Sequence, residues 1–135
     1  MNKVIWITGA SSGIGKALAL KFAKEGWQVA ASARREDLLN EMSDSNENIS
    51  SFPLDVNMRE KCKEIFEQIK NKYQNVDICF FSTGTWDPKK EKDIDMEQIE
   101  NTMNTNFFGT LNCIKTVEEY FKNKKNGHIS IVSSV

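Results

Sequence analysis

The sequence predicts an α/β fold in which a doubly wound parallel sheet lies between two layers of helices. Two observations support this prediction. Five short apolar segments alternate with amphipathic helical segments along the chain, which is typical of β-α-β units with parallel strands. In addition, a glycine-rich turn joins the first apolar segment to the first helix. The expected strand order is 3-2-1-4-5, and residues 1–135 are expected to form a single domain.

The elements follow in order along the chain. Strands are expected at the apolar segments 4–7, 27–33, 49–54, 76–81 and 128–132. Helices are expected at 16–24, 38–42, 59–73 and 96–123. In the first helix, the spacing gives Ile14, Leu18 and Phe22 a common face. In the last helix, the predicted apolar stripe is Ile99, Met103, Phe107, Leu111, Ile114, Val117 and Phe121.

The turn between the first strand and the first helix has the pattern T-G-x-x-x-G-x-G over residues 8–15. Gly9 permits a tight turn, Gly13 lets the backbone approach a pyrophosphate, and Gly15 lets the helix lie close to the strand. The helix N-terminus then offers free N–H groups to phosphates. The residues of this turn expected to bind a dinucleotide are Thr8, Gly9, Ser11, Ser12, Gly13, Ile14 and Gly15.

Two alternatives to dinucleotide binding exist for this turn. A P-loop requires glycine where Ala10 stands and serine or threonine where Ala17 stands, so the Gly15-Lys16 pair does not make one. The other alternative is a glycine-rich turn that binds nothing.

The T-G-x-x-x-G-x-G turn resembles the cofactor loop of the short-chain dehydrogenase/reductase family, whose fold is Rossmann-like. The resemblance covers essentially the whole chain, which would be the first half of a typical member. It implies an oxidoreductase that interconverts a carbonyl and an alcohol, acts on a small-molecule substrate and forms a dimer or tetramer of identical chains. It implies NADP(H) or NAD(H) as the cofactor.

The end of the second strand favours NADP(H). An NAD-binding protein usually has an acidic residue there to hold the ribose 2′-hydroxyl, whereas this chain has Ala33 followed by Arg34 and Arg35. Two guanidinium groups suit a 2′-phosphate. The alternative is a pair of solvated arginines at a strand–helix turn.

Two further segments are expected at the cofactor. Asp55 and Val56 follow the third strand, and the resemblance implies that they contact the adenine; alternatively, Asp55 shapes a turn or caps the next helix. Ser82, Thr83 and Gly84 end the fourth strand. The family usually has Asn-Asn-Ala-Gly at this place, so only Gly84 matches, and Ser82 is expected to retain part of the missing strand tether.

The resemblance implies two catalytic positions, Asn106 in a proton relay and Ser134 beside the reacting carbonyl or alcohol. From spacing alone, Asn106 lies on or beside the buried stripe of the last helix, where a structural amide bonded to a nearby carbonyl is the preferred interpretation. From the sequence alone, Ser134 ends the fifth strand. The family's proton donor is a tyrosine with a lysine four residues later, and neither Tyr73 nor Tyr120 has that lysine.

The chain is therefore predicted to be the N-terminal part of a family member and to be inactive alone, with a sticky long helix. The rival prediction is a dinucleotide-binding or scaffold module without catalysis. A Tyr-x-x-x-Lys sequence after Val135 in the natural gene would favour the enzyme.

The overall composition excludes several classes of function. The net charge is −1, which argues against binding to nucleic acid or to a membrane surface through a basic field. No apolar run approaches the ~20 residues of a membrane span, and a strand begins too early for a signal peptide. A cytoplasmic protein is therefore expected. The three cysteines are widely spaced and there is one histidine, so we expect buried thiols and neither disulfides nor a metal site.

Overall fold

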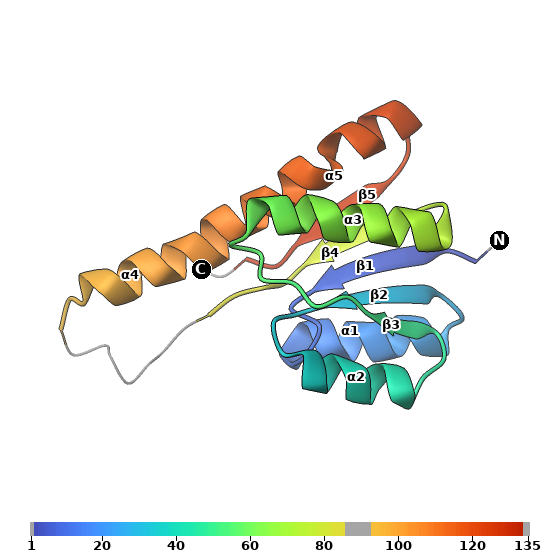
Figure 1. The fold of residues 1–135 in the computed structure, drawn as a ribbon, viewed down its shortest axis with the longest axis horizontal. Coiled ribbons are helices and arrows are strands. Elements are labelled where there is room, and N and C mark those ends of the chain that lie inside the picture. Colours follow the sequence, from blue (N-terminus) through green and yellow to red (C-terminus); the bar gives the residue numbers. More distant parts are fainter. Residues whose placement is uncertain (1, 86–92, 134–135) are drawn as a thin grey trace.

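Five parallel strands form one sheet in the order β3-β2-β1-β4-β5, as predicted (Figure 1). The structure is a computed structural model that describes residues 2–85 and 93–133. The strands are β1 (Val4–Thr8), β2 (Gln28–Ser32), β3 (Ile49–Ser51), β4 (Ile78–Phe81) and β5 (His128–Ile131). Each begins within two residues of its predicted start.

The helices lie in two layers, with α1 and α2 on one face of the sheet and α3 and α5 on the other (Figure 1). The three-layer α/β/α arrangement is therefore confirmed. The helical elements are α1 (Gly13–Lys24), α2 (Glu36–Asp44), α3 (Arg59–Tyr73), α4 (Met96–Met103), the π-helical segment η2 (Asn104–Gly109) and α5 (Thr110–Lys124). The predicted bounds of α3 are correct, and the predicted long helix is present but passes through η2.

Strand β1 is the centre of the sheet, paired with β2 on one side and β4 on the other. All five of its residues are buried, because helices cover both faces of the sheet. Ile5 and Ile7 pack in the core below α1 and α2, whereas Val4 and Trp6 pack in the core below α3 and α5. This alternation fills both cores from one strand.

Trp6 lies at the centre of the core between the sheet and helices α3 and α5, and it is 0% exposed. Its ring stacks on Phe66 of α3 with a centroid distance of 5.5 Å and meets the edge of Phe81 at 5.6 Å. Its indole N–H donates a hydrogen bond of 2.9 Å to the hydroxyl of Ser32 in β2. The one polar group of this large side chain is thus satisfied inside the core.

The face of α1 that is buried differs from the common face of Ile14, Leu18 and Phe22. The residues of α1 that are buried are Gly15, Ala19 and Ala23, while Ile14 is 60% exposed and Leu18 is only half-buried. Small side chains let the helix axis approach the sheet closely. The larger apolar side chains are consequently displaced to the flanks of the contact.

The predicted stripe of the long helix is buried only in its second half. Val117 of α5 is buried, but α4 has no buried residue, and Ile99 and Met103 are 45% and 47% exposed. A π-helical turn contains more residues than an α-helical turn. A stripe drawn at one period through η2 therefore does not follow one face of the helix.

The last residue of η2, Gly109, makes a close contact with the loop between β3 and α3. A Cβ atom placed on Gly109 would lie 2.5 Å from Cγ2 of Val56, so a larger residue would require the Val56 side chain to move.

The three cysteines are buried and free, as expected for small core thiols. Within residues 2–85 and 93–133, no helix has the length and apolarity to cross a membrane. The same described residues contain no group of three or more side chains able to hold a metal ion.

Candidate cofactor-binding cleft

A cleft of about 340 Å³ opens at the carboxyl ends of β1, β2 and β4. In an open α/β sheet this is where ligands bind, at the point where the strand order reverses. It brings together residues from four separate segments that were singled out in the sequence. The lining residues are Gly9, Ser11, Ser12, Gly13, Ile14, Gly15, Ala33, Arg34, Arg35, Leu54, Asp55, Val56, Ser82, Thr83, Gly84, Thr105 and Val132.

The glycine turn packs tightly against β4. Gly9 has a φ of +65°, and a Cβ atom on it would lie 2.8 Å from the backbone of Ser82. A Cβ atom on Gly15 would overlap the carbonyl oxygen of Gly9. The tight turn and the close helix–strand packing predicted for these two glycines are both present, and no other residue type fits either place without displacing backbone.

The N-terminus of α1 is open toward the cleft. The preceding residue, Ser12, makes no side-chain capping bond, and the first turn contains no acidic residue. A Cβ atom on Gly13 would meet no atom within 4 Å. The first N–H groups of the helix thus face free space with a partial positive charge. This arrangement fits a phosphate group.

Thr8 is the one predicted residue of the turn that does not line the cleft. It is buried at the end of β1, and its hydroxyl has no hydrogen-bond partner among the described residues. Its carbonyl oxygen accepts a hydrogen bond of 2.7 Å from the Ser82 hydroxyl. Ser82 therefore ties β4 to β1, which is the partial tether expected of this smaller side chain.

The two arginines at the end of β2 differ in their surroundings. Arg35 forms an exposed ion pair with Asp37, Nη2 to Oδ2 at 3.1 Å, and this hydrogen bond lowers the pKa of the Asp37 carboxyl below its usual range. Arg34 has no ion-pair partner in the part of the chain that the structure describes. Of the two guanidinium groups, that of Arg34 is the more available to a ligand.

Asp55 and Val56 line the cleft and are held in place by hydrogen bonds. The Asp55 carboxylate accepts a hydrogen bond of 3.0 Å from the Asn57 backbone N–H, so the turn-forming alternative is confirmed. Met58 is the N-cap of α3, so the alternative of Asp55 as a helix cap is wrong. The Val56 carbonyl oxygen accepts hydrogen bonds from the Asn112 amide at 2.9 Å and from the Cys62 thiol at 3.7 Å.

Asn106 lies in η2 and is exposed, so its predicted place at the buried stripe is wrong. Its side chain instead forms two hydrogen bonds with the backbone of Thr85. Oδ1 of Asn106 accepts a hydrogen bond of 2.7 Å from the Thr85 N–H, and Nδ2 donates one of 3.0 Å to the Thr85 carbonyl oxygen. It does not line the cleft. Ser134, the other predicted catalytic residue, lies outside the described residues.

Four lining residues were not predicted to bind the cofactor: Ala33, which directly precedes Arg34, and Leu54, Thr105 and Val132. Leu54 directly precedes Asp55 and Val132 follows β5, so the rule that ligands bind at the carboxyl ends of strands points to both. Thr105 is next to Asn106, but no sequence pattern indicates that it, and not its neighbour, faces the cleft.

The two tyrosines lie away from the cleft. The Tyr73 side chain packs beside Phe52, and burial raises the pKa of its hydroxyl. The Tyr120 hydroxyl accepts a hydrogen bond of 3.0 Å from the Val76 N–H. The Tyr120 hydroxyl is therefore structural, whereas the buried Tyr73 hydroxyl has no hydrogen-bond partner among the described residues. Neither hydroxyl lines the cleft.

The sheet order and the glycine turn at the start of α1 define a Rossmann-like α/β domain. The family model of the short chain dehydrogenases matches residues 3–135. The chain therefore belongs to the short-chain dehydrogenase/reductase family of oxidoreductases.

Individual relatives agree with this assignment. The chain is 37% identical over 139 residues to the uncharacterized oxidoreductase Lmo0432 of Listeria monocytogenes, covering 99% of this chain and 56% of that protein. It is 33% identical over 138 residues to the 3-oxoacyl-[acyl-carrier-protein] reductase FabG of Thermotoga maritima, with the same coverages of 99% and 56%. Among solved structures, ElxO with NADP bound is similar with a TM-score of 0.90 and 29% identity, over 99% of this chain and 56% of that one. The chain thus spans about half the length of these relatives.

Proposed function

We propose that the chain is the cofactor-binding half of an NADP(H)-dependent oxidoreductase that interconverts a carbonyl and an alcohol. The observation that carries this proposal is the cleft, where an uncapped helix N-terminus, an unpaired arginine and a fixed carboxylate face one space. The likeness to a reductase of 3-oxoacyl groups and to a structure with bound NADP supports both the reaction and the cofactor.

In this proposal, each part of the cleft binds a different part of the cofactor. The first N–H groups of α1 at Gly13 bind the pyrophosphate, and Arg34 binds the 2′-phosphate. Asp55 accepts a hydrogen bond from the adenine amino group, with Val56 against the ring, and the backbone at Gly84 lies along the ribose. The bound nicotinamide supplies or accepts the hydride.

The substrate side is proposed from the family alone. Ser134 orients the carbonyl or alcohol, and Asn106 contributes to the proton relay while it holds Thr85 in place. The proton donor, a tyrosine with a lysine four residues later, belongs to the half of the relatives that this chain does not span. We therefore expect this chain alone to bind the cofactor and not to turn over a substrate. Assembly of identical subunits and a cytoplasmic location also stay predictions.

Titration with NADPH and NADH, followed by nicotinamide fluorescence, tests the proposal. We expect tighter binding of NADPH, and we expect Arg34→Ala to weaken NADPH binding about tenfold because a charge-assisted contact is lost. NADH binding should not change in this variant. Arg35→Ala is the matched control, and its effect should be smaller because Arg35 is already paired with Asp37. Equal affinity of the wild type for the two cofactors would contradict the preference for NADP(H).

The exposed apolar side chains of the long helix favour a second candidate, a dinucleotide-binding scaffold without catalysis. Ile99, Met103 and Phe107 are all about half exposed. This candidate is supported if the natural gene has no Tyr-x-x-x-Lys sequence after Val135 and the protein still binds NADPH.

A further inference from the structure

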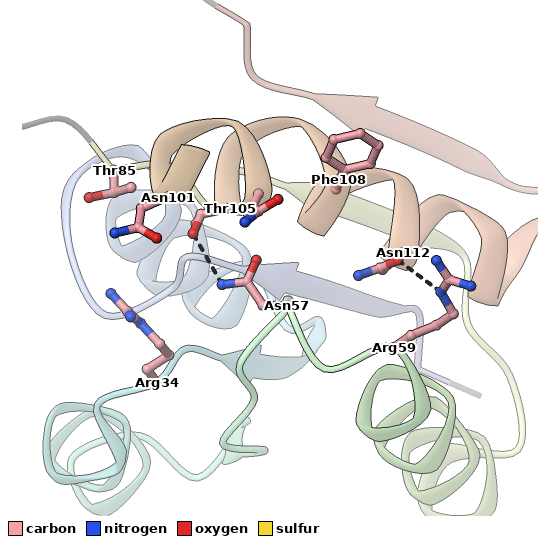
Figure 2. A pocket seen from close by; sticks show the side chains of 9 residues that line it. Arg34, Asn57, Arg59, Thr85, Asn101, Thr105, Phe108 and Asn112 are labelled. Atoms are coloured by element: carbon pink, nitrogen blue, oxygen red, sulfur yellow. Dashed lines mark hydrogen bonds between the residues drawn. The ribbon is translucent and has the colours of Figure 1, made fainter. Parts of the chain in front are cut away.

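A second cavity, of about 780 Å³, lies beside the cofactor cleft (Figure 2). Arg34 stands on its β2–α2 wall, and Asn57 and Arg59 stand on the wall formed by the β3–α3 loop and the start of α3. The third wall consists of α4, η2 and the first turn of α5, with Asn101 and Asn112 among its residues. Nothing in the proposed binding of the cofactor uses Asn57, Arg59 or Asn101.

The charged residues that line this cavity are all positive. Two guanidinium groups line it, the other polar lining residues are amides and hydroxyls, and none of the lining residues is acidic. The chain as a whole carries a net charge of −1, so the cationic character is local. Figure 2 shows Arg34 and Arg59 at opposite sides of the cavity, with Asn57 between them. An anion inside it would meet cations from two directions.

The guanidinium of Arg59 is held in place. Its Nε donates a hydrogen bond of 3.3 Å to Oδ1 of Asn112, and Nδ2 of Asn112 donates to the Val56 carbonyl at 2.9 Å. Among the described residues Arg59 has no acidic partner. Its terminal N–H groups are therefore oriented by one neighbour without being neutralised, which reduces the conformational entropy lost on binding.

The amide wall is also ordered. Nδ2 of Asn57 donates a hydrogen bond of 3.1 Å to the hydroxyl of Thr105, which leaves the amide oxygen of Asn57 as an acceptor. Asn101 is directed toward the space above Arg34 (Figure 2). Amide side chains both donate and accept hydrogen bonds, so this wall is matched to a ligand with several hydroxyl groups, and less well to a bare ion.

We propose that this second cavity binds a small, hydroxyl-rich organic phosphate of the phosphorylated-sugar class. The phosphate lies against the guanidinium of Arg59, and the hydroxyl groups lie against the amides of Asn57 and Asn101, next to Arg34. Because Arg34 lines both this cavity and the cofactor cleft, the ligand competes with the 2′-phosphate of NADP(H) for one guanidinium. The competition rests on the proposed function, but the binding itself does not.

Two-dimensional NMR of the ¹⁵N-labelled chain, titrated with ribose 5-phosphate, tests the binding. We expect saturable shifts of the side-chain resonances of Asn57, Asn101 and Arg59, no shifts with ribose, and weaker binding of inorganic phosphate. Arg59→Gln should weaken the binding of ribose 5-phosphate about tenfold, since a charge-assisted hydrogen bond is lost. Lys63→Gln is the matched control: it removes one positive charge one turn further along α3 from a residue that does not line this cavity.

Two results would overturn the proposal. In one, shifts are confined to residues 9–15, so that the glycine turn alone has taken up the phosphate. In the other, Arg59→Gln binds ribose 5-phosphate as tightly as the wild type while its far-ultraviolet circular dichroism and thermal midpoint remain normal. If Arg59→Gln does not fold, Asn101→Ala on the exposed side of α4 replaces it, with a several-fold loss of affinity expected and unchanged affinity counting against the proposal.

The competition is measured separately with NADPH and NADH in the presence of ribose 5-phosphate. We expect a lower apparent affinity for NADPH and an unchanged affinity for NADH. Binding of ribose 5-phosphate by a chain that binds neither cofactor would contradict the proposed function, but it would support the proposal that the second cavity binds a phosphorylated sugar. An unchanged NADPH affinity at saturating ribose 5-phosphate would refute the sharing of Arg34.

Discussion

Helix α1 and the long helix α4–η2–α5 pack against the rest of the fold in different ways. Helix α1 meets the sheet along its whole length through Gly15, Ala19 and Ala23. The buried residues of the long helix are Gly109 of η2 and Cys113 and Val117 of α5, whereas α4 has no buried residue. The comparison teaches that the size of the side chains at a contact, as well as their spacing, determines which face of a helix is buried.

The largest expected effect is at the tightest contact of α1. We predict that Gly15→Ala lowers the free energy of unfolding by about 3 kcal/mol, because the added Cβ overlaps the Gly9 carbonyl and backbone must move. Urea unfolding followed by circular dichroism measures this. Ala17→Gly, on the exposed side of α1, is the control and should cost only about 1 kcal/mol. A Gly15→Ala variant as stable as the wild type would show that α1 is not held by close packing.

The next effect separates the two halves of the long helix. Val117→Ala should cost about 2 kcal/mol of unfolding free energy, because it leaves a cavity in a core with no exposure to water. Ile99→Ala, which removes more atoms from α4, should change that free energy by less than about 0.5 kcal/mol because Ile99 is already solvated. Equal losses for the two variants would mean that α4 is covered in solution.

A smaller effect is expected at the end of α5. Lys125 ends this helix with a φ of +56°, a left-handed conformation that glycine adopts more readily than lysine. Lys125→Gly should therefore raise the unfolding free energy by about 0.5 kcal/mol. Lys125→Ala separates the conformational effect from loss of the charge and should give no gain. A rise in stability for alanine as large as that for glycine would remove the conformational explanation.

The smallest effect concerns the exposed face of α5. The Glu118 carboxylate accepts hydrogen bonds from Lys122 at 2.7 Å and from Lys115 at 3.1 Å, and these two lysines, Lys122 first, lower the pKa of Glu118 below its usual range. The resulting stabilisation is present above the pKa of an unfolded glutamate and is lost as the pH falls through the lower pKa of the folded state.

Carboxyl-detected NMR titration measures this pKa directly. It should rise toward the ordinary value in 1 M NaCl, because salt screens exposed ion pairs. A Glu118 pKa that does not respond to salt would contradict an ion-pair origin.

The sequence was a sufficient guide to the sheet and to most of the cleft. Alternating segments indicated every strand and their order, because β-α-β topology leaves few arrangements. The rule that ligands bind at the carboxyl ends of strands then placed Arg34, Asp55 and Gly84 at one cleft although they lie far apart in the chain.

The sequence was a poor guide where a local distortion changes the geometry. A single period of apolar residues through 96–123 predicts Asn106 at the buried side of the helix, but η2 interrupts that period. The true partner of Asn106, the backbone of Thr85, cannot be read from spacing, because that contact depends on where the chain runs after β4. Thr105 was missed for the same reason.

The burial of Trp6 has an optical consequence. An indole enclosed by aromatic rings and away from water fluoresces at shorter wavelength than a solvated one, and dissolved iodide cannot quench it. Trp27 is only half-buried and lies near the Lys3 ammonium, 5.5 Å from the ring centroid, so its emission responds to solvent. The short-wavelength emission of Trp6 therefore reports on the middle of the sheet, and because the chain has three tryptophans it is followed alone only after the other two are replaced by phenylalanine.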